Sequence, residues 1–146
     1  MLPDLPASLR LLPAPLASAM DRCNVVRLRR GATRAALLAM VAAGLRDPRV
    51  DAALAALESG RTGDGPARDA LLRLLEDLDN AAWTTHLRVG AGAATAADHQ
   101  RAFRLARSAN ALWSALDADP TVAAADAAYE AHAVLEDWEP LLDLWS

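Results

Sequence analysis

Three histidines, His86, His99 and His132, are the only imidazoles in the 146 residues and the natural candidates for metal ligation or acid-base chemistry. His132 and Glu136 are four residues apart, which places two ligating side chains on one face of a helix. However, the Glu-x-x-His pairs typical of carboxylate-bridged di-metal bundles do not occur in the sequence. We therefore interpret His132 and Glu136 as a solvated pair and expect no metal or other cofactor.

Two glycine-rich segments, 60–65 and 90–92, have the composition of loops that cradle phosphate groups. A P-loop ends in Gly-Lys-Ser or Gly-Lys-Thr and follows a strand, and a dinucleotide-binding loop also follows a strand. Neither condition holds, because the sequence contains no lysine and both segments follow helical patterns. We interpret both segments as turns between helices.

Basic residues are concentrated near the N-terminus and acidic residues near the C-terminus. Residues 1–50 contain eight arginines and three acidic residues, whereas residues 108–146 contain eight acidic residues and no arginine. The densest basic cluster consists of Arg27, Arg29, Arg30 and Arg34. One interpretation is that this basic cluster binds phosphate groups. The favoured interpretation is that it forms intramolecular ion pairs with the acidic C-terminal helix.

The C-terminal segment 135–145 combines two tryptophans and four leucines with acidic residues. Chain ends usually fray, so large apolar side chains here suggest that another surface buries them. That surface belongs to the chain's own core, to a second copy of the chain or to another protein. Tryptophan is strongly enriched at interface hot spots. The predicted partner-binding residues therefore come from this tail and the basic cluster: Trp138, Leu141, Leu142, Trp145, Arg27, Arg29, Arg30 and Arg34.

The elements that must position these residues are predicted to be helices. Alanine and leucine are abundant, isoleucine is absent and aromatic residues make up 4% of the chain, so residue types that favour strands are scarce. Apolar residues recur at helical spacing. We expect an all-α, single-domain bundle of about five to seven helices. The similar segments 47–53 and 119–125 suggest a weak internal two-fold repeat.

Proline and glycine predict the first boundaries. Residues 1–15 contain four prolines and are expected to form an irregular N-terminal arm, followed by a single all-helical domain over residues 16–146. The first helix is predicted over 16–30, with Gly31 as its stop. The next is predicted over 33–46, where four apolar residues share a face: Leu37, Leu38, Val41 and Leu45.

Later helices have clearer start signals. Asp47-Pro48 and Asp119-Pro120 each place a capping aspartate before a proline in the first turn. A long central helix is predicted from Pro66 to about Arg88, and Pro140 is expected to interrupt the last long helix. The apolar face of the central helix is formed by Leu71, Leu74, Leu75, Leu78 and Ala82.

Composition narrows the function classes. Cys23 is the only cysteine, so no intrachain disulfide can form. The net charge of −4 argues against broad binding to nucleic acids or anionic membranes. No apolar stretch approaches the roughly 20 residues of a membrane span, and Asp4, Arg10 and the prolines oppose a signal peptide. A cytoplasmic protein is expected.

The sequence favours a non-enzymatic helical protein–protein interaction module, such as an adaptor, a regulator, or an antitoxin- or immunity-type binder. Its partner is expected to be another protein or a second copy of the chain. The alternative is a helical-bundle enzyme or small-ligand-binding protein with a site near His86 and His99. A deep pocket with converging polar groups would favour the alternative, and an exposed apolar patch on a convex surface would favour the interaction module.

Overall fold

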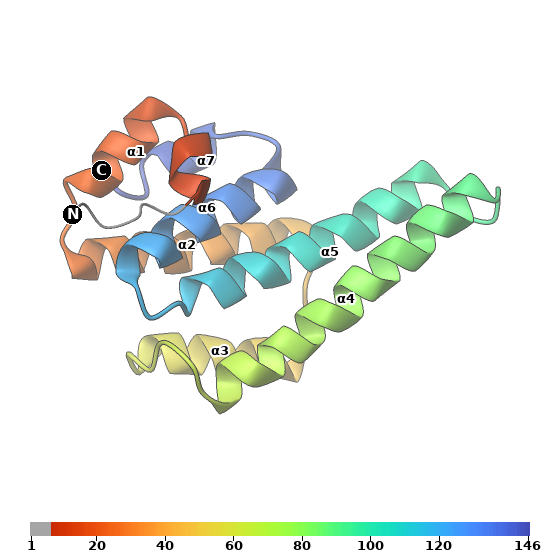
Figure 1. Ribbon diagram of the computed structural model, residues 1–146, viewed down its shortest axis with the longest axis horizontal. Helices are drawn as coiled ribbons and strands as arrows, with labels where there is room; N and C mark the ends of the chain where they lie inside the picture. Colours follow the sequence, from red (N-terminus) through yellow and green to blue (C-terminus); the bar gives the residue numbers. More distant parts are fainter. Residues whose placement is uncertain (1–6) are drawn as a thin grey trace.

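The protein is all-α, as its composition predicts. A computed structural model describes residues 7–146, and this part contains seven α-helices, one short 3-10 helix and no strand (Figure 1). The elements are η1 (Ala7–Leu11), α1 (Ala14–Asp21), α2 (Val25–Ala43), α3 (Pro48–Glu58), α4 (Pro66–Gly90), α5 (Ala96–Ala115), α6 (Pro120–Leu135) and α7 (Glu139–Leu142). Within residues 7–146, no helix combines the length and apolarity needed to cross a membrane.

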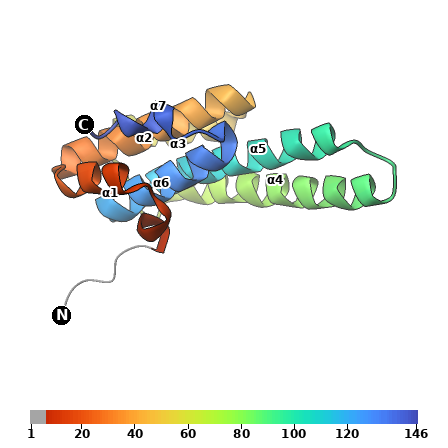
Figure 2. The same cartoon turned by 90° about the horizontal axis from the view of Figure 1, so that it is seen from above.

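Three helices, α2, α5 and α6, pack against one another and form the centre of the molecule. Helix α6 contributes mainly methyl groups, because its buried residues are Ala123, Ala124, Ala125, Ala127, Ala128, Ala131 and Val134. Small side chains allow neighbouring helices to approach closely. Around this centre, α4 packs along α5, α3 packs against α4, and η1 and α1 contact α6 (Figures 1 and 2).

The larger apolar side chains of α2 lie mostly outside the core. Hydrophobic periodicity normally marks the buried side of a helix, yet Leu37, Leu38 and Val41 are exposed, and of the four predicted face residues only Leu45 is buried. The buried side of α2 is instead lined mostly by small residues, namely Gly31, Ala32, Ala35, Ala36 and Ala39. Both α5 and α6 pack on α2, and small residues permit that close packing.

The predicted stop at Gly31 is wrong. Helix α1 ends at Asp21, and α2 begins at Val25 after Asn24, whose side chain accepts a hydrogen bond from the backbone N–H of Arg27 (2.9 Å). Helix α2 then continues through Gly31 to Ala43. Gly31 is buried beneath the indole ring of Trp145, and a Cβ atom at this position would overlap that ring. The glycine therefore provides space for a distant side chain and does not end the helix.

The Asp-Pro start signals are confirmed for α3 and α6. Asp47 accepts a hydrogen bond from the backbone of Arg49, and Asp119 accepts from the backbone of Thr121 and Val122. The side-chain hydrogen bond from Arg49 also lowers the pKa of Asp47 below its ordinary value. The two similar segments of the sequence thus share a local helix start.

The end of α6 differs from the prediction. The helix ends at Leu135, where Glu136 adopts a left-handed backbone conformation with φ of 58°. Pro140 lies in the first turn of α7, a position that a proline tolerates because its missing N–H has no helical partner there. The tail therefore turns away from α6 four residues before the proline that was expected to interrupt it.

Candidate functional site

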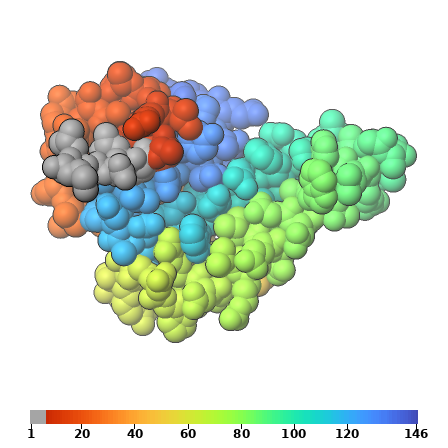
Figure 3. Space-filling view, viewed as in Figure 1, coloured from red at the N-terminus to blue at the C-terminus, as the bar shows by residue number. Residues whose placement is uncertain are grey.

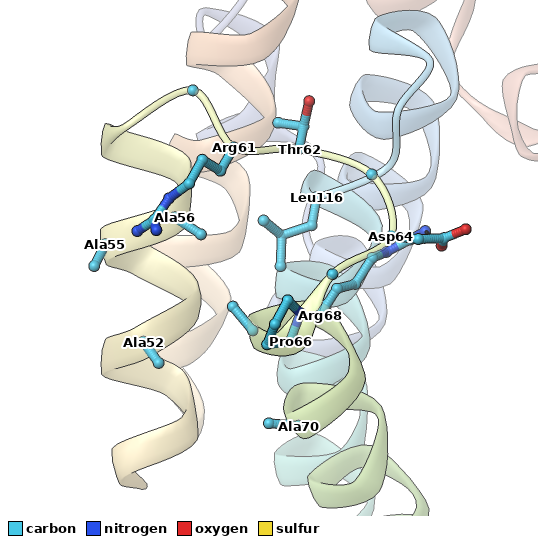
Figure 4. Close-up of a pocket in the computed structure, with 14 residues that line it drawn as sticks. Ala52, Ala55, Ala56, Arg61, Thr62, Asp64, Pro66, Arg68, Ala70 and Leu116 are labelled. Atoms are coloured by element: carbon cyan, nitrogen blue, oxygen red, sulfur yellow. Dashed lines mark ion pairs between the residues drawn. The ribbon is translucent and has the colours of Figure 1, made fainter.

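A groove of about 760 Å³ lies between α3, the following loop and the start of α4 (Figure 4). The loop over residues 60–65 is a turn between two helices, as predicted, and it forms one wall of the groove. Methyl groups of Ala52, Ala56 and Ala70 line the helical walls, and Leu116 points into the space between them. The groove is mainly a surface of small apolar groups and loop backbone.

The Arg68 side chain, which lines the groove and is mostly covered, has structural partners. The guanidinium of Arg68 lies 4.0 Å from the ring centroid of Trp113, 3.4 Å from the Asp117 carboxylate and 3.6 Å from that of Asp64. These contacts hold the start of α4 to the end of α5. In Figure 4, Asp64 points away from the groove. The groove thus lacks the converging polar set that the ligand-binding alternative requires.

A second candidate surface is the outer half of the α4–α5 hairpin, which projects beyond the other helices (Figure 3). Leu71, Leu74 and Leu75 fill the inner half of α4 and are buried. Farther along α4, Trp83 and Leu87 are 62% and 56% exposed. Large apolar side chains concentrated on a projecting arm are typical of binding surfaces.

Four aromatic rings form a ladder across this hairpin. The ring centroids of Trp83 and His86 are 5.6 Å apart, those of His86 and His99 are 5.1 Å apart, and those of His99 and Phe103 are 6.3 Å apart. The guanidinium carbon of Arg107 lies 5.7 Å from the Phe103 ring. The structure thus brings together His86 and His99, the two residues of the alternative site. Within residues 7–146, no three potential ligands among His, Cys, Asp and Glu are grouped to hold a metal.

The hairpin tip is fixed by local hydrogen bonds. The backbone of Asp98 donates to the Thr95 hydroxyl (3.1 Å), and the backbone of Thr95 donates to the Asp98 carboxylate (2.9 Å). The hydrogen bond that the Thr95 backbone donates to this carboxylate lowers the pKa of Asp98 below its ordinary value. Gly92 adopts a φ of 75°, which only glycine adopts without strain, and this closes the turn between the helices. The aromatic ladder is therefore carried on a defined framework.

The basic cluster is divided between internal and exposed roles. Arg29 donates to backbone carbonyls at the end of α5, including that of Ala118 at 2.7 Å. Burial lowers the pKa of Arg29, and the nearby carboxylates of Asp117 and Asp119 oppose this shift. Arg27 donates to the carbonyl of Trp145 at 3.5 Å.

The ion pairs expected between this cluster and the acidic C-terminal helix are not formed within residues 7–146. The partners of Arg27 and Arg29 are backbone carbonyl oxygens, because these arginines lie beside the ends of α5 and of the chain. Arg30 and Arg34 are exposed and form no side-chain hydrogen bond or ion pair with the described residues. Two cations of the cluster therefore remain on the surface.

The C-terminal tail packs largely on its own chain. Leu141 and Trp145 are buried, and the indole N–H of Trp145 donates to the carbonyl of Leu28 (3.2 Å). Trp138 stacks on His132 with their ring centroids 3.9 Å apart, while Leu142 is half-buried. The chain's own core thus covers the two deepest tail residues, and a partner-binding role for the tail stays a prediction.

Trp83 and Leu87 were not among the predicted site residues, although the helical spacing of α4 indicates their position. They are four residues apart and therefore lie on one face of the helix. The apolar face assigned to the central helix runs through Leu71, Leu78 and Ala82, and Trp83 lies one position beyond it. A helix turns by about 100° per residue, which places Trp83 off that face.

No protein-family model matches this chain, and no curated protein or solved structure is significantly similar to it.

Proposed function

We propose that this protein is a non-enzymatic helical interaction module that binds another protein chain through the outer half of the α4–α5 hairpin. The observation that carries the proposal is the exposure of Trp83 and Leu87 on the projecting arm. Full burial of a large apolar side chain is worth about 1.5–3 kcal/mol relative to full exposure, and Trp83 and Leu87, at 62% and 56% exposed, leave more than half of that surface in water. A partner that covers them gains this free energy.

The aromatic ladder favours a protein partner over a small molecule. The rings of Trp83, His86, His99 and Phe103 lie side by side across two helices, on a projecting surface. Small ligands usually bind in concave sites that enclose most of their surface. The groove between α3 and the start of α4 lies at the opposite end of α4 from His86, and neither His86 nor His99 lines it. The ligand-binding alternative needs a pocket and the pair His86 and His99 at one place, and in this fold the groove and the histidine pair are separated.

A site-specific photo-crosslinking experiment tests this proposal in cells. A benzophenone amino acid replaces Trp83 in one variant and Ser18, an exposed residue of α1, in a control variant. We expect a discrete protein adduct from position 83, weakened by Leu87→Asp on the same chain, and none from position 18. Equal adducts from both positions, or none from position 83, would contradict the proposed binding surface.

A further inference from the structure

One exposed line of residues runs along the outer side of α2. Arg30, Arg34, Leu37 and Val41 follow one another at intervals of four, three and four residues, and we call them the α2 stripe. All four are exposed, and Val41 reaches 82%. The α2 stripe begins with two cations and ends with two aliphatic side chains. Most residues on the buried side of α2 are glycine or alanine, so Leu37 and Val41 are larger than most of the side chains that α2 buries.

A second exposed line runs along α4 with the same intervals. Glu76, Asn80, Trp83 and Leu87 form what we call the α4 stripe, and all four are exposed. The α4 stripe begins with an acidic and a polar residue and ends with two large apolar side chains. Glu76 forms no ion pair with a residue in 7–146.

Resting on the proposed function, we infer that the partner is a second copy of this chain, whose α2 stripe packs against the α4 stripe in parallel. Each stripe spans eleven residue steps, or about 16 Å of helix. Intervals of four and three residues are those at which two helices interlock along a seam. In register, Arg30 faces Glu76, Leu37 faces Trp83, and Val41 faces Leu87.

Charge fixes the direction of this pairing. A parallel contact joins the cationic start of one stripe to the acidic start of the other and buries the apolar ends together. An antiparallel contact would place Arg30 beside Leu87 and Glu76 beside Val41, which desolvates both charges without a partner. Three residues before Arg30 and Glu76, the same register would place Arg27 against Arg73, and these two positive charges repel each other. The contact therefore begins at Arg30 and Glu76.

The contact joins two different surfaces, so it is heterologous. Both stripes are exposed within one chain, so they do not cover each other there. Each copy offers an α2 stripe to one neighbour and an α4 stripe to another, which produces a chain of copies or a ring. We expect association that increases with concentration and continues beyond a dimer unless a ring closes.

Mixing two defective variants tests this arrangement. Leu37→Ser/Val41→Ser disables the α2 stripe, and Trp83→Ser/Leu87→Ser disables the α4 stripe. We expect each variant alone to be monomeric in sedimentation velocity, with its dissociation constant raised at least about tenfold. An equimolar mixture should form a one-to-one pair, because one intact stripe of each kind remains. Ala42→Ser and Ala81→Ser, at exposed positions beside the stripes, should associate like the wild type.

A charge exchange tests the register. Arg30→Glu and Glu76→Arg should each weaken association, and the double variant should restore it. Circular dichroism melts confirm that all variants fold. A monomeric wild type, a mixture that stays monomeric, or a double variant that is weaker than either single variant would overturn the inference. A photo-adduct from position 83 to a different protein would overturn it while leaving the proposed function intact.

Discussion

At the scale of single residues, the contact of Gly31 with Trp145 joins the first part of the chain to its last residues. The indole N–H donates to the carbonyl of Leu28, and the ring covers the backbone at Gly31. Trp145 is only 1% exposed. A glycine inside a helix ordinarily destabilises it by about 0.5–1 kcal/mol relative to alanine. Here that cost is offset by burial of the largest fully buried side chain of the described residues.

We predict that Gly31→Ala lowers the free energy of unfolding by about 1–3 kcal/mol, because the added methyl group displaces the Trp145 ring. In a Trp145→Ala background the same substitution should stabilise the protein by about 0.5–1 kcal/mol, since only the helix preference of alanine remains. Urea denaturation of the four proteins in this cycle measures both effects. A Gly31→Ala effect of the same sign in both backgrounds would show that the ring is not the cause.

Two neighbouring residues of the same type can have different environments, and Arg29 and Arg30 show why. Arg29 lies beside the carbonyls that end α5, whereas Arg30 is rotated by about 100° around α2 and faces solvent. The sequence identifies both as one basic cluster. Which of them is internal depends on where α5 ends in space, and that position is set by packing.

At the scale of elements, the tail from Trp138 to Ser146 acts as an internal clamp. Leu141 and Trp145 are buried in the core, and Trp138 stacks on His132. We predict that truncation after Asp137 lowers the free energy of unfolding by about 3–6 kcal/mol through loss of this buried apolar surface. The melting temperature should fall by about 10 °C or more.

Light scattering and thermal melts on full-length and truncated protein measure this outcome. Deletion of Ser146 alone is the matched control, because Ser146 is the last residue of the tail and is exposed. An unchanged melting temperature, or a change in mass without a change in melting temperature, would mean that the tail does not act as an internal clamp.

Helix starts that depend on local chemistry could be predicted from the sequence. The capping aspartates before Pro48 and Pro120 satisfy backbone N–H groups within three residues, so their pattern is complete in the sequence. The continuation of α2 through Gly31 could not be predicted, because its cause is a side chain at the other end of the chain. The close approach of His86 and His99 could be predicted in part, since a short turn folds their helices together.

At the scale of the whole molecule, small side chains line much of the centre and several larger apolar groups remain outside. Alanines of α2, α5 and α6 form much of the core, whereas Leu37, Val41, Trp83 and Leu87 are exposed. Close packing of small residues favours short distances between helices. The same arrangement leaves apolar surface on α2 and α4, and this is the surface that the proposed interaction would use.

A polar cluster joins three helices beside this core and gives the last prediction. Arg107 of α5 lies 3.2 Å from Glu130 of α6 and 3.1 Å from Asp79 of α4, and Asn110 donates to Glu130 at 2.9 Å. Burial raises the pKa of Glu130 above its ordinary value, and the charge of Arg107 opposes this shift without cancelling it. The carboxylates of Asp126 and Asp79 add to the increase.

A raised folded-state pKa means that the folded protein binds this proton more tightly than the unfolded chain does. The contribution of Glu130 is therefore fully present below the unfolded pKa of about 4.3 and is lost as the pH rises through the higher folded pKa. We predict that the wild type loses stability relative to Glu130→Gln across this window, because glutamine does not titrate. Urea denaturation of both proteins over a pH series gives the difference, in which the other titrating groups cancel. Glu58→Gln, at an exposed position, should follow the wild type. A wild type that instead gains stability over Glu130→Gln with rising pH would show that attraction to Arg107 outweighs burial.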